Sequence, residues 1–414
     1  MNTKHILATS ILALALLQLT PARAADTILH SFTGGTTDGS QPYGSLTLVG
    51  SMLYGMTTYD GSGGDGTIFR VNTDGSGYGI LHNFTGGTTD GFNPYGSLML
   101  SGSNLYGMTK GGGGNNQGAL FTIKTDGTGY SLLHSFNGVQ EGTNPYGSLT
   151  ISGSKLYGMT YINGSGFDGT VFSMNFNGSG YTALHNFTGP SADGSGPRGS
   201  LTLVGSKLYG MTSLGGSSNE GALFSVNTDG SGYSLLHNFT GGTSDGGTPY
   251  YGSLTLVGSK LYGMTESGGS ASQGVIFDIN LDGSGFTVLH SLDQASSHDG
   301  FSPYGSLTLS GSKLYGMTYG GGIGINSHGT IFSIDTDGSG FGVLQSFAGQ
   351  PGDGGSPYGD VTLSADGQFL YGMTNSGGTA GKGVIFAAPT PEPASAALLG
   401  LGTLLLAARR RRSA

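Results

Sequence analysis

The pentapeptide "LYGMT" at residues 53–57 occurs seven times in this chain of 414 residues. Successive copies begin 52, 51, 52, 53, 53 and 56 residues apart. Each copy follows a second shared segment, which in the first unit is "DGSQPYGSLTL" from Asp38. Self-similarity with a period of roughly 50 residues is typical of repeat architectures. We therefore interpret most of the chain as seven copies of one structural unit.

Four short apolar segments separated by glycine-rich turns make up one unit. The first two are joined by Gly50-Ser51 and the last two by Asp74-Gly75-Ser76-Gly77, which suit tight hairpins. Four strands in a unit of this length are typical of a propeller blade. The sequence therefore predicts an all-β fold, a seven-bladed β-propeller of four-stranded antiparallel blades. In the first unit we expect strands over Gly44–Val49, Leu53–Thr57, Gly66–Asn72 and Tyr78–Phe84.

The ends of the repeat array indicate how the ring closes. The seventh unit stops after its third expected strand, at Pro389. A matching fourth strand lies at the start of the chain, where "DTILHSF" (Asp26 to Phe32) is similar to the fourth strands of the other units. Pairing of this N-terminal segment with the last unit would cover an exposed sheet edge. An open solenoid, the alternative, predicts no such permutation.

The repeated residues suit particular places in a blade. Gly-Ser at the start of each first strand has small side chains, which allow seven inner strands to converge near the axis. In the second strand, Tyr54 and Met56 project on one side and are expected to fill the space between neighbouring sheets. Gly55 would allow a facing ring or backbone to approach closely.

Both ends of the chain have the patterns of sorting segments. An apolar run from Ile6 to Leu19 precedes Ala22-Arg23-Ala24, as in a secretory signal that signal peptidase removes. At the other end, an apolar stretch over residues 394–408 would span roughly 22 Å as a helix, against a hydrocarbon core of about 30 Å. We expect a signal peptide over residues 1–25, the propeller over residues 26–388 and a sorting tail over residues 389–414.

The tail resembles the PEP-CTERM sorting signal of Gram-negative bacteria that make extracellular polysaccharide. The resemblance implies transient insertion of the tail into the membrane and recognition by an exosortase, a membrane cysteine peptidase and transpeptidase. A plain C-terminal membrane anchor, the alternative, explains the apolar stretch and the arginines but leaves the Pro-Glu-Pro unexplained. The residues that match the signal are Pro391, Glu392, Pro393, Arg409, Arg410, Arg411 and Arg412.

The composition limits the classes of function. The chain has 84 glycines, no cysteine and no tryptophan, so no disulfide can stabilise the fold. Without the two terminal segments, 9 basic residues face 23 or 24 acidic residues. Such a surface repels phosphate backbones, and we expect no nucleic-acid partner.

The repeat itself is similar to the GloVer tandem repeat of bacterial surface proteins. The similarity rests on the pattern G-S-L-T-L-x-G-S-x-L-Y-G-M-T, followed by a Gly-rich loop, G-x-x-F and D-G-S-G-[YF], and it extends over nearly all of residues 26–388. It implies a propeller-type repeat and brings no established catalytic role. The departures from the pattern are Arg198 in place of the usual Tyr, the additional residue at Tyr250-Tyr251, and the longer hairpin at residues 364–367.

Histidine recurs at one place in the fourth strands. Because one unit has Gln345 there and the other six share the histidine, we expect a structural hydrogen bond rather than catalysis. The six histidines are His30, His82, His134, His185, His237 and His290.

A glycan-cleaving propeller is the main enzymatic alternative. The Asp-Gly hairpins are similar in position to the Asp-boxes of sialidases, which grip a substrate carboxylate with three arginines, whereas the exported body has only Arg70 and Arg198. No asymmetric set of acid, base and nucleophile stands out, and we expect no enzymatic activity. Acids for another glycosidase, which the sequence cannot place at catalytic separation, could come from Glu141, Glu220, Glu266 or Asp293.

We expect no cofactor, with weak calcium binding in a few loops at most. The loops "DGSGGDG" from Asp60 and "GSGFDG" from Gly164 resemble half of a Gly/Asp calcium turn. Other units do not have an aspartate at the place of Asp65 and Asp168, so a repeated calcium site is excluded. The equivalent residues are Gln117, Glu220, Gln273, His328 and Lys382.

The sequence thus favours a protein exported to the cell surface or extracellular matrix of a Gram-negative bacterium, with a structural or binding role such as adhesion. Variable loops on one propeller face would supply the binding surface. Beyond signal peptidase and the exosortase, the candidate partners are exopolysaccharide and another surface protein.

Overall fold

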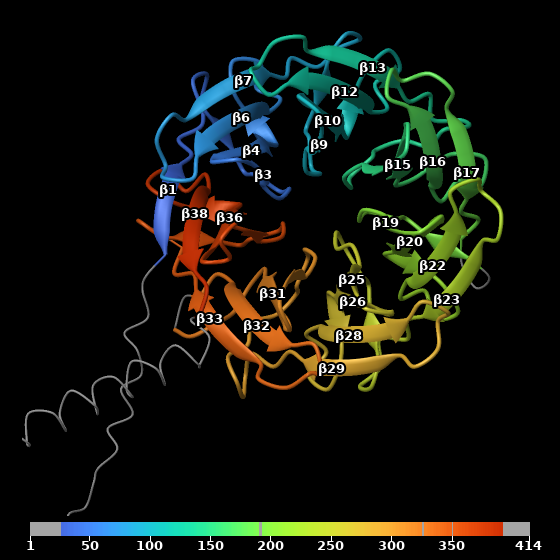
Figure 1. Ribbon diagram of the computed structural model, residues 1–414, viewed down its shortest axis with the longest axis vertical. Helices are drawn as coiled ribbons and strands as arrows, with labels where there is room; N and C mark the ends of the chain where they lie inside the picture. The colour runs from blue at the N-terminus through green and yellow to red at the C-terminus, as the bar shows by residue number, and fades with distance from the viewer. Residues whose placement is uncertain (1–25, 190–192, 325–326, 350, 392–414) are drawn as a thin grey trace, which may run out of the picture.

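The computed structural model of the chain describes residues 26–189, 193–324, 327–349 and 351–391. These residues form a closed ring of seven blades around a central axis and contain no helix (Figure 1). Each blade is a four-stranded antiparallel sheet whose strands follow one another from the axis to the rim. The predicted seven-bladed propeller is therefore confirmed.

Corresponding strands have nearly the same length in all blades. The first strands, nearest the axis, are β3 (Thr47–Val49), β9 (Met99–Ser101), β14 (Thr150–Ser152), β19 (Thr202–Val204), β25 (Thr255–Val257), β30 (Thr308–Ser310) and β35 (Thr362–Leu363). The second strands are β4 (Met52–Thr57), β10 (Asn104–Thr109), β15 (Lys155–Thr160), β20 (Lys207–Thr212), β26 (Lys260–Thr265), β31 (Lys313–Thr318) and β36 (Phe369–Thr374). The third strands are β6 (Thr67–Asn72), β12 (Ala119–Lys124), β16 (Thr170–Asn175), β22 (Ala222–Asn227), β28 (Val275–Asn280), β32 (Thr330–Asp335) and β38 (Val384–Pro389). The fourth strands, at the rim, are β7 (Gly79–Asn83), β13 (Ser131–Ser135), β17 (Thr182–Asn186), β23 (Ser234–Asn238), β29 (Thr287–Ser291), β33 (Gly342–Ser346) and β1 (Thr27–Ser31).

The first strand is shorter than predicted, because β3 begins at Thr47 and not at Gly44. Gly44 and Ser45 contact the neighbouring blade instead of pairing within their own sheet. The amide of Ser45 donates a hydrogen bond to Ser97 Oγ, at 2.7 Å. A Cβ on Gly44 would lie 2.3 Å from the carbonyl oxygen of Gly96. These contacts between blades take the place of the strand pairing that was expected over residues 44–46.

The same close approach is repeated around the axis. In each blade a glycine stands where an added Cβ would meet the carbonyl oxygen of the equivalent glycine in the next blade, at distances between 1.9 and 2.6 Å. The last of these contacts joins Gly359 to Gly44, so the circle is complete. The expected convergence of small residues at the axis is confirmed. The seven glycines are Gly44, Gly96, Gly147, Gly199, Gly252, Gly305 and Gly359.

The ring closes through the N-terminal strand, as predicted. β1 pairs with β38 in antiparallel register, with Thr27 opposite Ala387 and Ser31 opposite Val384. Phe32, which follows β1, is fully buried in a core cluster that includes Phe69 of blade 1 and Met373 of blade 7. The first residues of the ring therefore connect the last blade to the first.

The cores lie between blades, where LYGMT was expected to pack. Tyr54 and Met56 of blade 1 belong to one buried cluster with Leu98 and Phe121 of blade 2. Within blade 1, a Cβ on Gly55 would lie 2.5 Å from Cζ of Phe69, so glycine allows that ring to pack against the strand. Both expected roles of the pentapeptide are confirmed.

The blades have two different faces. On the hairpin face, tight turns such as residues 50–51 and 73–78 join first to second and third to fourth strands. On the loop face, longer segments such as residues 58–66 and 84–96 join second to third strands and one blade to the next. Small two-stranded sheets, which the sequence did not predict, connect these segments in five blades. They pair β2 (Gly39–Ser40) with β5 (Tyr59–Asp60), β8 (Gly91–Phe92) with β11 (Gly111–Gly112), β18 (Gly194–Ser195) with β21 (Leu214–Gly215), β24 (Gly246–Gly247) with β27 (Ser267–Gly268), and β34 (Gly354–Gly355) with β37 (Ser376–Gly377).

Candidate binding site at the axis of the loop face

The repeated histidines bind carboxylates on the loop face. In the first pair, Nε2 of His30 lies 3.1 Å from Oδ2 of Asp38. The imidazole also stacks on Tyr78 of the next blade, with 3.6 Å between ring centroids. The same pairing recurs in His82–Asp90, His134–Glu141, His185–Asp193, His237–Asp245 and His290–Asp299, at 2.8 to 3.2 Å. The expected hydrogen bond is thus present at all six positions.

The carboxylate of each pair is held by several donors. Oδ1 of Asp38 accepts from the Tyr78 hydroxyl at 2.6 Å, and Oδ2 accepts from the Thr33 amide at 2.8 Å. Burial raises the pKa of Asp38, but the hydrogen bonds from His30, Tyr78 and Thr33 outweigh it and lower the pKa to about 2. The group therefore stays ionised and joins the connecting loop to two neighbouring blades.

The sixth blade differs, because Gln345 of β33 replaces histidine there. Its amide Nε2 donates to Oδ1 of Asp26, at 3.1 Å. Burial, together with the negative charge of Asp353, raises the pKa of Asp26 to about 6. The sixth blade therefore lacks the histidine–carboxylate pair of the other six.

Half-buried tyrosines surround the axis on the loop face and form what we call the tyrosine girdle. Ring centroids of neighbouring members lie 4.5 to 5.2 Å apart. Arg198 closes the remaining gap, since its guanidinium lies over Tyr146 at 5.3 Å and over Tyr250 at 4.3 Å. The tyrosines of the girdle are Tyr43, Tyr95, Tyr146, Tyr250, Tyr304 and Tyr358.

Arg198 is held mainly by aromatic groups. Its guanidinium donates to the hydroxyls of Tyr161, at 2.7 Å, and of Tyr250, and lies 4.2 Å from the centroid of Tyr161. No carboxylate is paired with it among the described residues. The positive charge at the mouth of the axis is therefore not neutralised by a direct ion pair.

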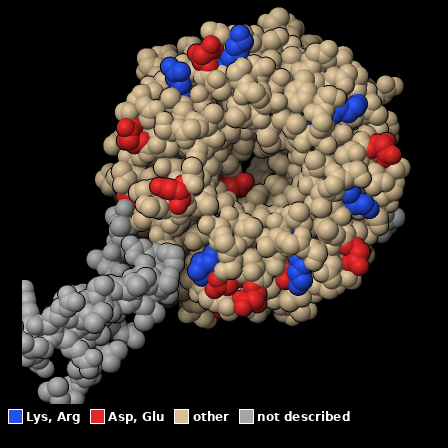
Figure 2. Space-filling view, in the orientation of Figure 1, with Lys and Arg blue, Asp and Glu red and all other residues tan. Residues whose placement is uncertain are grey.

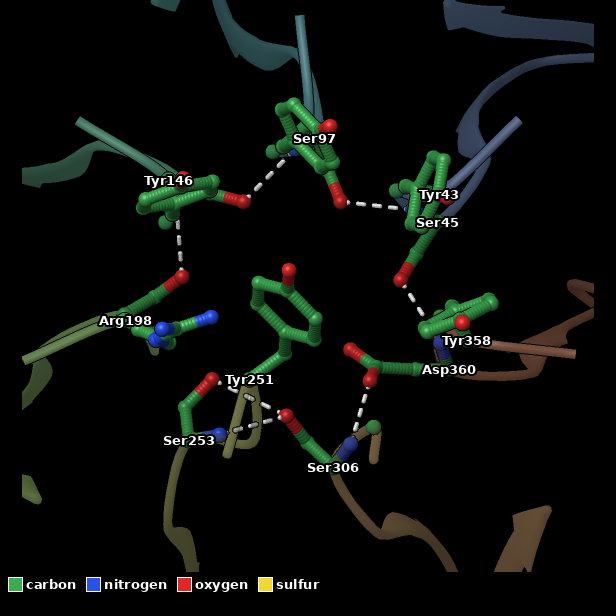
Figure 3. A pocket seen from close by; sticks show the side chains of 18 residues that line it. Tyr43, Ser45, Ser97, Tyr146, Arg198, Tyr251, Ser253, Ser306, Tyr358 and Asp360 are labelled. Carbon is green, nitrogen blue, oxygen red and sulfur yellow. Dashed lines mark hydrogen bonds between the residues drawn. The ribbon is translucent and has the colours of Figure 1, made fainter. Parts of the chain in front are cut away.

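The additional residue of the fifth unit fills the centre of the girdle. Tyr251 crosses the axis (Figure 3), and its ring lies 6.4 Å from Tyr95 and 6.1 Å from Tyr358, on the other side of the ring. The cavity that remains along the axis has a volume of about 40 Å³. That volume leaves room for no more than a few water molecules. A larger ligand must therefore bind above Tyr251, at the mouth, and not inside the channel.

Below the girdle, serines link one blade to the next. The amide of Ser97 donates to Ser148 Oγ, and that of Ser148 to Ser200 Oγ, each at 2.7 Å. In blade 7 the serine is replaced by Asp360, whose carboxylate accepts from the Ser306 amide and whose amide donates to Ser45 Oγ at 2.8 Å. Burial raises the pKa of Asp360.

A second group of mouth residues comes from the position after each LYGMT. Lys110 Nζ lies 5.6 Å from the Tyr95 centroid, and Glu266 Oε1 accepts from the Tyr304 hydroxyl at 3.2 Å. Burial raises the pKa of Glu266, and its interactions with Tyr304 and Arg198 reduce that effect. This position differs in almost every blade. Its residues are Thr58, Lys110, Tyr161, Ser213, Glu266, Tyr319 and Asn375.

The mouth was missed as a site from sequence alone. Arg198 and Tyr250-Tyr251 were visible as departures from the repeat, and such departures are the signal that could have found it. The opposite, hairpin face of the ring, shown in Figure 2, also has a hollow at the centre, with charged side chains mostly toward the rim. A ring of tyrosine edges and hydroxyls, with one guanidinium that has no carboxylate partner, is suited to binding and provides no obvious nucleophile.

The other candidate residues are not brought together. Arg70 lies in β6 of blade 1, whereas Arg198 lies at the axis of blade 4. Glu220 Oε2 accepts from Thr248 Oγ1 at 3.3 Å, and Asp293 Oδ1 accepts from the Ala295 amide of its own loop at 2.9 Å. With Glu141 bound to His134, three of the four candidate acids have separate local partners.

The candidate calcium loops are also tied to local partners. Asp60 forms an ion pair with Lys382 at 3.3 Å, and Asp168 Oδ1 accepts from Ser195 Oγ at 2.6 Å. Across the part of the chain that the structure describes, no three His, Asp or Glu side chains are grouped to hold one ion. Those same residues include no helix able to cross a membrane.

The signal peptide and most of the sorting signal lie outside the described residues, which end at Pro391. The structure therefore does not describe Glu392, Pro393 or Arg409 to Arg412.

Comparison with known proteins identifies the family. Residues 15–222 and 190–386 match the Gloeobacter/Verrucomicrobia repeat, so the chain belongs to this family of propeller repeats. Residues 389–412 match the PEP-CTERM protein-sorting motif. The chain is thus a propeller exported to the cell envelope or surface, with processing by an exosortase implied by its tail. No curated protein was found to match it.

Similar solved structures share the fold. An oligogalacturonate lyase in complex with manganese has a TM-score of 0.58 and 13% identity, covering 89% of this chain and 98% of that chain. A protein described as a 6-phosphogluconolactonase from Bacteroides uniformis has a TM-score of 0.50 and 17% identity, covering 79% of this chain and 88% of that chain. At such identities these likenesses concern the architecture alone.

Proposed function

We propose that this exported propeller is a non-catalytic adhesion module that binds extracellular polysaccharide through the tyrosine girdle. The observation that carries the proposal is the break in symmetry at Arg198 and Tyr250-Tyr251, which places a guanidinium without an ion pair and an additional aromatic ring at the mouth. Tyr and Arg are the residues most enriched at binding hot spots. Flat tyrosine rings with hydroxyl donors suit the apolar faces and hydroxyl edges of sugars.

The test compares two arginine substitutions in the exported protein. Arg198→Tyr restores the residue of the other blades, and should weaken binding to the host's extracellular polysaccharide at least about tenfold, as for a hot-spot residue. Arg70→Tyr makes the same chemical change away from the mouth and should leave binding unchanged. Co-sedimentation with the polymer gives the affinity, and thermal melting checks the fold. Equal binding by both variants and the parent protein would contradict a site at the girdle.

Glycan cleavage at the same mouth is a second candidate function, favoured by the raised pKa of Glu266. A carboxyl group whose pKa is raised by burial is typical of a general acid in glycoside hydrolysis. If this function is correct, Glu266→Gln should abolish the release of reducing ends from the polysaccharide without changing the melting temperature. The binding proposal instead expects no reducing ends from the parent protein at all.

Delivery to the surface can be tested by mass. The arginine cluster should be absent from the protein recovered from its host, with the new C-terminus at or near Pro391. Substitution of Pro391-Glu392-Pro393 by alanines should retain the full-length form in the inner membrane. Mature surface protein that still carries Arg412 would contradict sorting by cleavage.

A further inference from the structure

A second hollow lies on the loop face between blades 2 and 3, away from the axis. It has a volume of about 500 Å³, within the range of about 300 to 1,000 Å³ typical of ligand sites. One wall is the connection after β13, residues 137–140, and the other is the loop before β16, residues 163–167. A hydrogen bond from the Gly164 amide to the Gly138 carbonyl, at 2.9 Å, joins the two walls. We call this hollow the blade 2–3 groove.

The groove is lined by amides and apolar groups and has no charged side chain. Its polar lining consists of Gln117, Asn137, Gln140, Asn163 and Ser165. Gln140 bonds through its backbone amide, which donates to Asn137 Oδ1 at 3.3 Å. Its side-chain amide, like that of Gln117, makes no hydrogen bond to other described residues. An amide offers both donor and acceptor atoms, so these groups can bind the hydroxyls of a neutral ligand.

Two apolar side chains of the groove are unusually exposed. Val139 is 79% exposed and Phe167 is 77% exposed, the highest values for large apolar residues in the described chain. Exposed apolar groups that gather at one hollow mark interaction sites more often than isolated ones do. The Phe167 ring is therefore available as a flat surface against which a ligand can stack.

Phe167 also has an unfavourable backbone conformation. Its φ is +69°, a region that bulky residues avoid. Blade 1 has a loop of the same length, "DGSGGDG", and there Gly64 occupies the equivalent position with φ +81°. The two loops are also held in the same way. The Gly61 amide donates to the Gly35 carbonyl at 2.8 Å, as the Gly164 amide does to the Gly138 carbonyl. Nothing in the loop requires a ring at this position, and strain retained without a packing partner indicates a functional role.

We propose that the blade 2–3 groove binds a neutral saccharide segment, with Phe167 stacked on a sugar ring and the amides of Gln117 and Gln140 bound to its hydroxyls. This inference rests on the proposed glycan-binding function and adds a second subsite to it. An anionic sugar is not favoured because the groove has no cation. The chain that forms one wall, from Asn163 back to Tyr161, leads directly to the girdle, where Tyr161 binds Arg198. One glycan chain could therefore contact both sites.

The decisive variant is Phe167→Gly, which copies the loop of blade 1. Probes are the neutral hexasaccharides of cellulose, chitin, mannan and starch, with hexagalacturonate as the charged comparison, and binding to the exported protein is measured by calorimetry. At least one neutral probe should bind, and Phe167→Gly should weaken it about tenfold or more while the melting temperature stays equal or rises. Gln140→Ala should weaken the same probe by a smaller factor, of about threefold to tenfold.

The matched control separates this site from the girdle. Arg198→Tyr should leave the affinity for the neutral probe within about twofold, whereas Phe167→Gly should leave Arg198-dependent binding of whole polysaccharide detectable. Absence of binding by all neutral probes, or equal binding by the Phe167→Gly variant, would overturn the groove proposal. Loss of the Arg198 effect on whole polysaccharide would instead overturn the girdle proposal and leave the groove result standing.

Discussion

The hairpin face and the loop face of this propeller have the same seven-fold origin but have diverged to different extents. On the hairpin face, Asp74 Oδ1 accepts from the amide and hydroxyl of Ser76, at 2.9 and 2.6 Å. The same turn recurs at Asp126, Asn177, Asp229, Asp282 and Asp337. The loop face has Arg198, Glu266 and Phe167, each present in one blade. Residues that build blades are therefore repeated, whereas these three candidate ligand-binding residues are not.

The largest effect is expected when the strand that closes the ring of repeated blades is removed. Deletion of residues 26–32 removes β1 and the buried Phe32, whose loss alone is worth about 3 to 5 kcal/mol. It also exposes β38 as an edge strand, so we expect destabilisation by more than about 5 kcal/mol together with aggregation. Melting and light scattering report the result. An unchanged melting curve would show that the pairing of β1 with β38 does not hold the ring together.

A methyl group at the axis should have the next largest effect. A Cβ on Gly96 would lie 2.4 Å from the carbonyl oxygen of Gly147, and neither backbone can move without opening the ring. We expect Gly96→Ala to cost about 3 kcal/mol, as for overpacking. Gly79→Ala is the matched control in β7, because nothing lies within 4 Å of its added Cβ. Chemical denaturation of both variants should separate them clearly.

Loss of one histidine should cost less and should be similar from blade to blade. His134→Ala and His237→Ala each leave a buried carboxylate with one donor fewer, at a cost of about 1 to 3 kcal/mol. His237→Gln copies the Gln345 of blade 6 and should recover part of that loss. None of these variants should change polysaccharide binding when measured below its melting range. If one of these variants alone lost polysaccharide binding, its blade would take part in the binding site, and its histidine would not be purely structural.

Low pH should also destabilise the fold, and the loss for each carboxylate should be smaller than the loss from the substitutions above. The folded-state pKa of Asp38 and of Asp90 is about 2, below the ordinary value of about 4, so the stability they provide is complete above about pH 4 and is lost as the pH falls toward 2. We expect on the order of 1 kcal/mol from each after solvent screening. Asp26 has the opposite sign, because its pKa is raised to about 6 and its contribution is lost as the pH rises from about 4 to 6. Denaturation of Asp38→Asn against pH should show a shallower acid limb.

The fold could be read from the sequence because each unit carries its own strand, turn and packing signals. The period and the displaced strand at residues 26–32 were sufficient to predict both blade number and closure. Strand limits were less certain at Gly44, since its contacts are with another blade. The two-stranded sheets involve glycine pairs such as Gly246–Gly247, which have no strand propensity.

The candidate sites were harder to predict, because they depend on positions that are far apart in the chain. Arg198, Tyr251 and Glu266 come together only when three units are arranged around one axis. In the groove, Phe167 was interpreted as part of a calcium-like loop. Its positive φ could not be predicted from its residue type. Single departures from an otherwise strict repeat were the available signal.

Closure by the first strand also determines how the protein is displayed. Both β1 and β38 have their outer ends on the hairpin face, and Thr390 is fixed there by bonds to Gly367 and Gln368. A propeller attached through its processed C-terminus would therefore stand with the hairpin face toward its support. The girdle and the groove would be turned outward, toward whatever approaches the cell, and the aspartate-rich turns would face the envelope.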